Sequence, residues 1–130
     1  MREIKFRAWD KAQECYLYDV QRAYDTLSGC VKYENGENAD YDEQCFDGFL
    51  DDEQYIVEQF TGLHDNNGNP IYEGDIVKVV SQYWGQLGNR YEVKFKQGAF
   101  CVKYSLLSEI SPSTLVIGNV HTNPELLEED

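Results

Sequence analysis

The stretch that decides the fold is Phe60–Val77, Phe-Thr-Gly-Leu-His-Asp-Asn-Asn-Gly-Asn-Pro-Ile-Tyr-Glu-Gly-Asp-Ile-Val. It holds the densest run of turn-forming residues in the chain. Before it, Tyr55–Phe60 is rich in β-branched and aromatic residues, which is typical of a strand, and we expect Gly62 to end that strand. After Asp75, the run Ile76–Val80 alternates poorly, which predicts a strand covered on both faces or one that passes through a barrel wall.

Within this stretch, Asn67-Gly68 predicts a hairpin turn, because an Asn-Gly pair supplies the positive φ that a tight hairpin needs. The Asp65 carboxylate can bond backbone amides further along the turn. Asp65 and the second and fourth residues after it also carry oxygen ligands, which raises the alternative of calcium. An EF-hand loop, however, needs glycine at its sixth position and glutamate at its twelfth, where this chain has Pro70 and Ile76. We therefore favour the turn and expect no metal.

A second turn or bulge is predicted at Glu73-Gly74-Asp75. Glycine is disfavoured inside a strand unless a bulge or a close contact requires it, so we expect Gly74 to hold a position that a Cβ would spoil. The two flanking acids form a weak catalytic signal, since 24 acidic residues are scattered over the chain. No nucleophile elbow, P-loop, dinucleotide fingerprint or zinc motif is present, and the two histidines lack metal-binding spacing. We expect no enzyme, no cofactor and no catalytic residue.

Charge narrows the range of partners. The formal net charge is -13 over 130 residues, and residues 1–60 hold 15 acidic against 6 basic side chains. Such a surface repels phosphate backbones, so direct nucleic-acid binding is not expected. The charge suits a basic partner protein, or it serves solubility alone.

The cysteines and the hydropathy indicate a cytoplasmic protein. None of the four cysteines forms a C-x-x-C pair, and the Met-Arg-Glu-Ile-Lys start resembles no signal peptide. Free, partly buried thiols are therefore expected ahead of disulfides or zinc. No window approaches the roughly 18 apolar residues of a membrane span.

The opening segment Glu3–Trp9 alternates cleanly and predicts an amphipathic strand. We expect Ile4, Phe6 and Ala8 to form its buried face. Lys5 and Arg7, with Trp9, would lie on the other face. The two basic side chains are expected to pair with carboxylates across a neighbouring strand, with anion binding as the alternative.

Further apolar runs predict more strands, at Cys15–Val20, Leu27–Tyr33, Tyr91–Lys96, Ala99–Tyr104 and Thr114–Val120. Apolar spacing predicts a short helix at residues 46–50. Asn123, with proline next to it, is typical of a helix start. The predicted fold class is mainly β, a small barrel-like antiparallel fold with one or two short helices, and a single domain over residues 1–130.

The polar loop 81–89 contains Tyr83 and Trp84. An aromatic pair in a glycine-containing loop is a candidate partner contact. The alternative is a lid that folds back over the core.

Three segments together resemble the YopX family of phage and prophage proteins of Gram-positive bacteria. They are Arg2–Asp10, the motif from Thr61-Gly62-Leu63 through Ile71–Val77, and Ile117-Gly118-Asn119 with Asn123–Leu127. Residues 11–52 carry none of these motifs. The resemblance implies a small, mainly β, barrel-like protein made in the host cytoplasm, and it suggests a homo-oligomer. It implies no activity and no catalytic residue, and turn formation suffices to explain Gly62, Asp65, Asn67, Gly68, Gly74 and Asp75.

Three functions remain open. The first is a non-enzymatic phage accessory protein that acts through protein–protein contact with itself or a host factor. The second is an acidic mimic of nucleic acid that blocks a host DNA- or RNA-binding protein. The third is a metal-dependent enzyme that uses clustered carboxylates.

Overall fold

The computed structural model describes residues 4–21, 32–33, 36, 50, 53–81, 84–103 and 105–127. Contacts group the chain into two compact units, residues 1–59 and 60–130. The single cooperative domain expected above stays a prediction. Most of the predicted helix at 46–50 and most of the predicted strand at 27–33 lie outside the described residues. Within the described part, no helix is long and apolar enough to cross a membrane.

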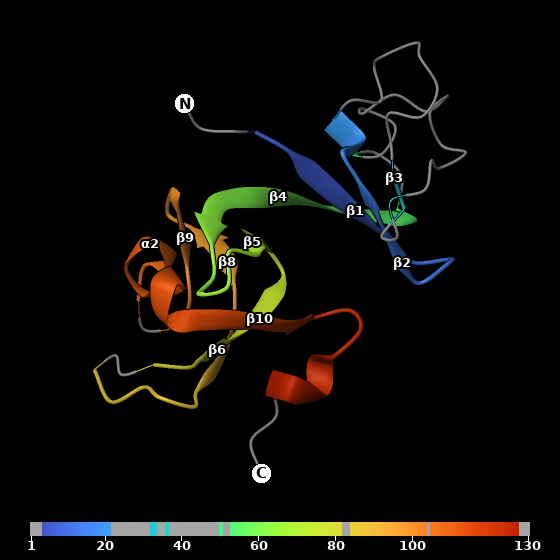
Figure 1. The fold of residues 1–130 in the computed structure, drawn as a ribbon. Helices are drawn as coiled ribbons and strands as arrows, with labels where there is room; N and C mark the ends of the chain where they lie inside the picture. The colour runs from blue at the N-terminus through green and yellow to red at the C-terminus, as the bar shows by residue number, and fades with distance from the viewer. Residues whose placement is uncertain are drawn as a thin grey trace. The chain divides into compact units, whose positions relative to one another are not determined.

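The N-terminal unit is an antiparallel sheet. Strand β1 (Phe6–Asp10) lies between β2 (Cys15–Tyr18) and the first half of β4 (Tyr55–His64), and β3 (Lys32–Tyr33) pairs with β2 (Figure 1). The buried Asp10 carboxylate organises the turn after β1, because one of its oxygens accepts hydrogen bonds from the Ala12 and Gln13 amides. Gln54 donates its side-chain amide to the same oxygen at 2.9 Å.

The predicted faces of β1 are only partly right: Ala8 is buried as expected and Phe6 is half-buried, but the face expected to be solvated is buried as well. Arg7, Ala8, Trp9 and Asp10 are all buried, whereas Ile4 is exposed. A run of consecutive buried residues means that both faces of the strand are covered, so alternation did not separate core from solvent. Arg7 tolerates burial because the strand register places it opposite Glu58 on β4. The predicted cross-strand pairing with a carboxylate is therefore confirmed for Arg7, but the pair is buried.

Glu58 joins three side chains of this unit. Its Oε1 atom accepts hydrogen bonds from Arg7 Nε and from the Tyr16 hydroxyl, each at 2.9 Å. The Arg7 guanidinium also lies 4.0 Å from the centre of the Tyr16 ring, a cation–π contact. Arg7 is only 4% exposed and Glu58 only 5%, so this ion pair and its tyrosine contacts lie in the interior of the unit.

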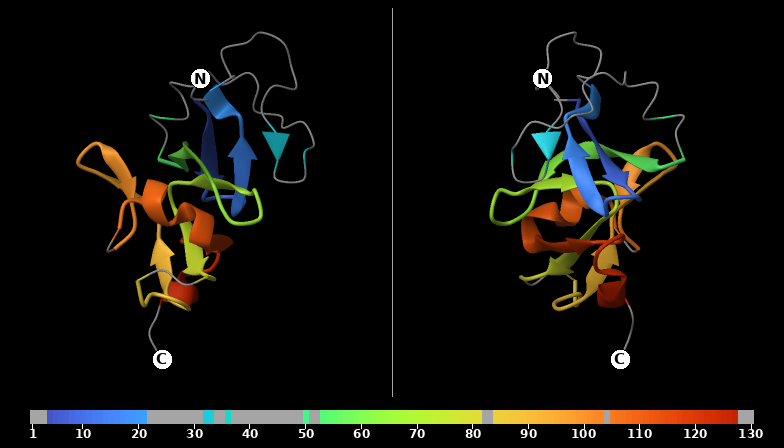
Figure 2. Two further views of the ribbon diagram at one scale, coloured as in Figure 1. Left: turned by 60° about the vertical axis from the view of Figure 1, so that its left-hand side comes forward. Right: turned by 90° about the vertical axis from the view of Figure 1, so that its right-hand side faces the viewer.

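The C-terminal unit starts with the second half of β4. It continues with β5 (Pro70–Tyr72), β6 (Asp75–Val79), β7 (Arg90–Glu92), β8 (Lys94–Lys96), β9 (Ala99–Cys101), α2 (Leu107–Ile110), η2 (Ser111–Ser113), β10 (Thr114–Asn119) and η3 (Pro124–Leu127). β6 is the centre of a three-stranded sheet, between β10 and β7, and β8 and β9 form a hairpin. Both views in Figure 2 show this hairpin, in orange, extending away from the β6–β10 pair.

The core of this unit combines strand and helix residues. Residues from β5 to β7, the β8–β9 region and α2 form one cluster, which consists of Ile71, Val77, Val79, Tyr91, Val93, Phe100, Val102, Leu107 and Ile110. Three of the five residues of β6 contribute apolar side chains with no exposed surface. The predicted mainly β, antiparallel class with short helices is confirmed.

Three local predictions need correction. Gly62 does not end its strand: β4 continues to His64, with a register shift against β5 and a positive φ of 84° at the glycine. The predicted strand Tyr91–Lys96 is divided at Val93, whose backbone bonds Gly74 and Asp75 and so interrupts the strand. Helix α2 was not expected, because its four residues are too few to show a helical period.

Gly74 adopts a φ of 89° and is buried between β5 and β6. Its N–H donates to the Val93 carbonyl, and its carbonyl accepts from the Val120 N–H. Nearby, the Asp75 carboxylate accepts a hydrogen bond of 2.8 Å from the Tyr72 amide and closes the turn. At this positive φ, any side chain would strain the backbone. The hydrogen bonds of its N–H and carbonyl groups hold Gly74 in that conformation.

Removing the Glu58 charge should destabilise the protein strongly. Glu58→Gln removes the carboxylate that pairs with the buried Arg7 cation, and we expect a loss of about 3–5 kcal/mol in the free energy of unfolding, measured by urea denaturation. The double variant Arg7→Met, Glu58→Met should be more stable than the single one, since no charge stays buried. The exposed Glu53→Gln serves as the control. A single variant as stable as this control would contradict the assigned role.

Gly74→Val should lower the free energy of unfolding by about 1–3 kcal/mol, because valine is strained at a φ of 89°. Gly98→Val is the matched control, since Gly98 has a φ of 82° but a Cβ added there would meet no atom within 4 Å. A larger loss at Gly74 would measure the packing contribution beyond backbone strain. An unchanged melting temperature for Gly74→Val would show that the glycine is incidental.

Candidate anion-binding site

The Asn67-Gly68 turn is held by one carboxylate. Asp65 Oδ1 accepts hydrogen bonds from the amides of Asn67 and Asn69, each at 2.9 Å. Its Oδ2 accepts from the Val116 amide of β10 at 2.9 Å and from the Asn69 side chain at 3.2 Å. Both oxygens thus face N–H donors, and Gly68 has the positive φ, 84°, that the turn requires. This geometry suits a structural turn and leaves the Asp65 oxygens turned toward protein.

The same hydrogen bonds set the ionisation of Asp65. Burial of the carboxyl raises its pKa, but the hydrogen bonds from Val116, Asn69 and Asn67 together outweigh burial and hold the pKa below its ordinary value. The residue is only 6% exposed, so the ionised carboxylate is an internal anchor. Of the six turn residues singled out in the sequence, Gly62 lies on β4, Asp65, Asn67 and Gly68 in the β4–β5 turn, Gly74 in the β5–β6 turn and Asp75 at the start of β6.

Trp84 is 88% exposed at the tip of the loop between β6 and β7 and has a φ of 46°. A side chain so exposed does not act as a lid over the core in this structure. Leu87, three residues further, is 52% exposed. Tyr83, the other predicted contact residue, lies outside the described residues. The loop thus presents two apolar side chains to solvent.

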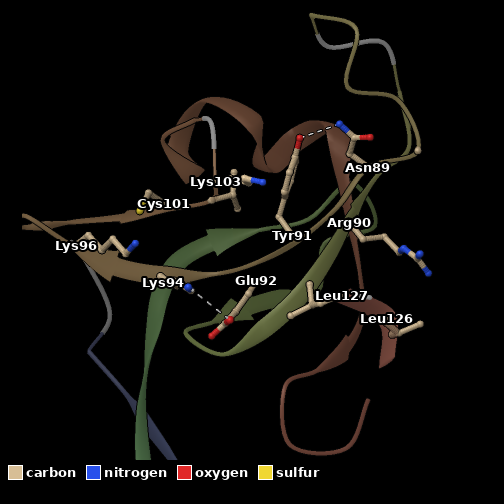
Figure 3. Close-up of a pocket in the computed structure, with 12 residues that line it drawn as sticks. Asn89, Arg90, Tyr91, Glu92, Lys94, Lys96, Cys101, Lys103, Leu126 and Leu127 are labelled. Carbon is tan, nitrogen blue, oxygen red and sulfur yellow. Dashed lines mark hydrogen bonds and ion pairs between the residues drawn. The ribbon is translucent and has the colours of Figure 1, made fainter. Parts of the chain in front are cut away.

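A pocket of about 660 Å³ opens on the C-terminal unit. Four of the five lysines and arginines of residues 60–130 line it, namely Arg90, Lys94, Lys96 and Lys103. Among the residues that the structure describes, Glu92 is the one acid in its lining. Figure 3 shows Arg90 and Lys96 at opposite ends of this group, with Lys94 and Glu92 between them.

Strand geometry explains why these side chains gather. Successive side chains of an extended chain alternate between faces, so every second residue from Arg90 to Lys96 is brought to one side. Of the intervening residues, Val93 is fully buried, whereas Tyr91, also buried, contributes to the pocket lining. Lys94 pairs with Cys101 across the hairpin. This pairing places Cys101, and Lys103 two residues after it, at the same pocket. Leu126 and Leu127 of η3 supply an apolar wall.

The floor of the pocket is fixed by hydrogen bonds. The Tyr91 hydroxyl accepts from the Asn89 side chain and donates to the Gln86 side chain, each at 2.9 Å. In contrast, the Lys94–Glu92 ion pair is loose, with 3.9 Å between nitrogen and oxygen and half of the Lys94 side chain exposed (Figure 3). An exposed pair of this kind contributes little stability. The pocket lining therefore combines a hydrogen-bonded tyrosine with a lysine, Lys94, whose side chain stays half exposed.

Sequence reasoning missed this pocket. The alternating charges of Arg90–Lys96 are visible in the sequence, but such alternation is equally typical of the solvent face of an ordinary strand. The signal that points to a site is the contrast between four local cations and a net charge of -13. Lys103 and the η3 leucines join the group only through folding.

The fold and this site define a small, mainly β protein whose C-terminal unit carries a basic pocket. The family model described as YopX protein matches residues 5–128, so the chain belongs to the YopX family. The chain is also similar to protein EF1440 from Enterococcus faecalis, known from a crystal structure. The TM-score is 0.62 at 26% identity, over 98% of this chain and 100% of that one. No curated protein matches the chain.

Removing the Asp65 charge should loosen the central turn. Asp65→Asn cannot accept all four hydrogen bonds, and we expect the free energy of unfolding at pH 7 to fall by about 1–3 kcal/mol. Because the folded pKa is depressed, this stabilisation is present above the unfolded value of about 4 and is lost as the pH falls through the folded pKa.

The difference between wild type and Asp65→Asn should therefore shrink as the pH is lowered from about 5 to about 2. Chemical denaturation at several pH values measures it. The exposed Glu109→Gln is the control for general loss of negative charge. A difference that stays constant across this range would rule out ionised Asp65 as the anchor.

Proposed function

We propose that this YopX-family chain is a non-enzymatic accessory protein of a phage or prophage, acting in the host cytoplasm by binding another protein, either a second copy of itself or a host factor. The observation that carries the proposal is the exposure of Trp84, at 88%, beside the exposed Leu87 on one loop. A tryptophan held out in solvent costs solubility and offers a large apolar area, and such residues dominate the energetics of protein interfaces.

The expected size of the contact supports this role. A tryptophan side chain that becomes buried removes roughly 150–250 Å² from water. At about 25 cal/mol per Å², this favours association by roughly 4–6 kcal/mol, before the entropy cost of binding is subtracted. A single such anchor suits a specific contact when neighbouring apolar groups such as Leu87 exclude water around it.

The carboxylates favour binding over catalysis. Among the described residues, Asp10, Glu58, Asp65 and Asp75 are buried, and each accepts hydrogen bonds from neighbouring donors. Within the same described ranges, no three His, Cys, Asp or Glu side chains gather as a metal ligand set. The buried acids thus have structural partners that explain them without chemistry. The acidic-mimic alternative depends mainly on residues 34–53, most of which lie outside the described part.

Site-specific photo-crosslinking tests the proposal. A photoreactive phenylalanine analogue placed at position 84, in a chain produced in host cells, should give a discrete covalent adduct. Mass spectrometry would identify it as a second copy or as a host protein. The same analogue at the exposed Asn67 is the control.

The Trp84→Ser variant should fail to compete with the photoreactive chain for the partner that the adduct identifies. Its melting temperature should equal that of the wild type. Adducts of equal yield at positions 84 and 67, or none at 84, would contradict the proposal.

A further inference from the structure

We infer that the pocket lined by Arg90, Lys94, Lys96 and Lys103 is a binding site for a small phosphorylated molecule. This goes beyond the proposed protein contact and does not depend on it. The first argument is charge. Four cations line one pocket of a chain with net charge -13, and among the described residues Glu92 is the one acid in that lining. Positive charges that line one pocket raise the electrostatic potential there, which attracts an anion.

The second argument is the kind of cation. Lysine ammonium groups bind phosphate as point charges, and an arginine guanidinium can bind two phosphate oxygens at once. Lys94 and Lys96 lie two residues apart on one side of β8, with Arg90 on β7 and Lys103 beyond β9. Cations that reach the pocket from several elements can contact more than one anionic oxygen, as an oligophosphate presents.

The third argument is size and the apolar wall. The volume of about 660 Å³ falls within the roughly 300–1,000 Å³ typical of small-molecule sites. Val102, Leu126 and Leu127 line the same pocket and offer contact for an apolar part of the ligand. An inorganic phosphate chain would use the cations alone, whereas an organic phosphate would also use this wall.

The fourth argument is preorganisation. Arg90 is paired with Lys78 in the β6–β7 register, and Lys94 and Lys96 are fixed across the hairpin from Cys101 and Ala99. The Tyr91 hydroxyl, locked by two hydrogen bonds, fixes the floor. The backbone that carries the cations is thus set before any ligand arrives, which lowers the cost of binding.

Long polyanions fit less well. A duplex or a long single strand must pass surfaces beyond the pocket on a chain of net charge -13, which repels phosphates. A small ligand experiences mainly the cations around it. We therefore commit to a small phosphorylated molecule, and nucleic acid and acidic peptide become outcomes that overturn the inference.

Isothermal titration calorimetry of the full chain tests the site with four probes at low salt. The probes are inorganic tripolyphosphate, ATP, a single-stranded oligonucleotide and an oligo-glutamate peptide. We expect saturable binding of tripolyphosphate or ATP that weakens with added salt. Tighter binding of tripolyphosphate assigns an inorganic chain, and tighter binding of ATP assigns an organic phosphate.

Charge variants locate the site. Lys94→Gln with Lys96→Gln should weaken binding by about fivefold for each charge removed, and Lys103→Gln provides a second, independent loss. Glu92→Gln should tighten binding by a similar factor, which a merely structural role would not produce. Lys11→Gln is the control for the loss of one positive charge, since Lys11 is exposed and does not line the pocket.

The inference is overturned by any of three results. These are no saturable binding of either phosphate probe, equal affinity for the control and the pocket variants, and tighter binding of the oligonucleotide or the peptide. The three substituted lysines are exposed, and unliganded melting temperatures check that each variant folds. Because Trp84 does not line the pocket, these results and the crosslinking result are independent.

Discussion

The C-terminal unit depends on one buried anion, the Asp65 carboxylate. It joins the turn that follows β4 to Val116 on β10, 51 residues away. The Asn66 amide and side chain add bonds to Thr114 and Pro112 beside it. β10 pairs with β6, and β6 pairs with β7, which carries Arg90 into the pocket. A charged acceptor serves this junction well, because four N–H donors converge there and a neutral side chain of this size could not satisfy them all.

Local chemistry made much of this unit predictable. Asn67-Gly68 formed the predicted turn because its conformational requirement lies in the two residues themselves. Strands β6 and β10 followed from apolar composition. The prediction failed for β1, where alternation assumed a strand with one solvated face. Arg7 is buried there because it contacts the Glu58 carboxylate of β4 and the Tyr16 ring of β2. The local sequence pattern around Arg7 does not show that these distant residues cover it.

The pocket could not be predicted for a related reason. Its cations come from β7, β8 and the segment after β9, and its apolar wall comes from η3. The break at Val93, which turns one apparent strand into two, depends on backbone bonds to the Gly74-Asp75 turn. Net charge also conceals the site, because a sum over 130 residues averages a local cluster of cations with acids elsewhere. Only the folded chain shows which charges are neighbours.

Attraction by the pocket cations and repulsion by the rest of the acidic chain act on different parts of a long anion. At physiological ionic strength, exposed charges are screened beyond about 8 Å, so an anion inside the pocket interacts mainly with the four cations around it. An extended polyanion at the same pocket places its remaining phosphates against the rest of a chain with net charge -13. Lower salt lengthens the screening distance, which strengthens both the local attraction and the distant repulsion. The local attraction favours every anion, whereas the distant repulsion weakens the binding of long anions alone. The proposed anion site would therefore select its ligands by length as well as by charge.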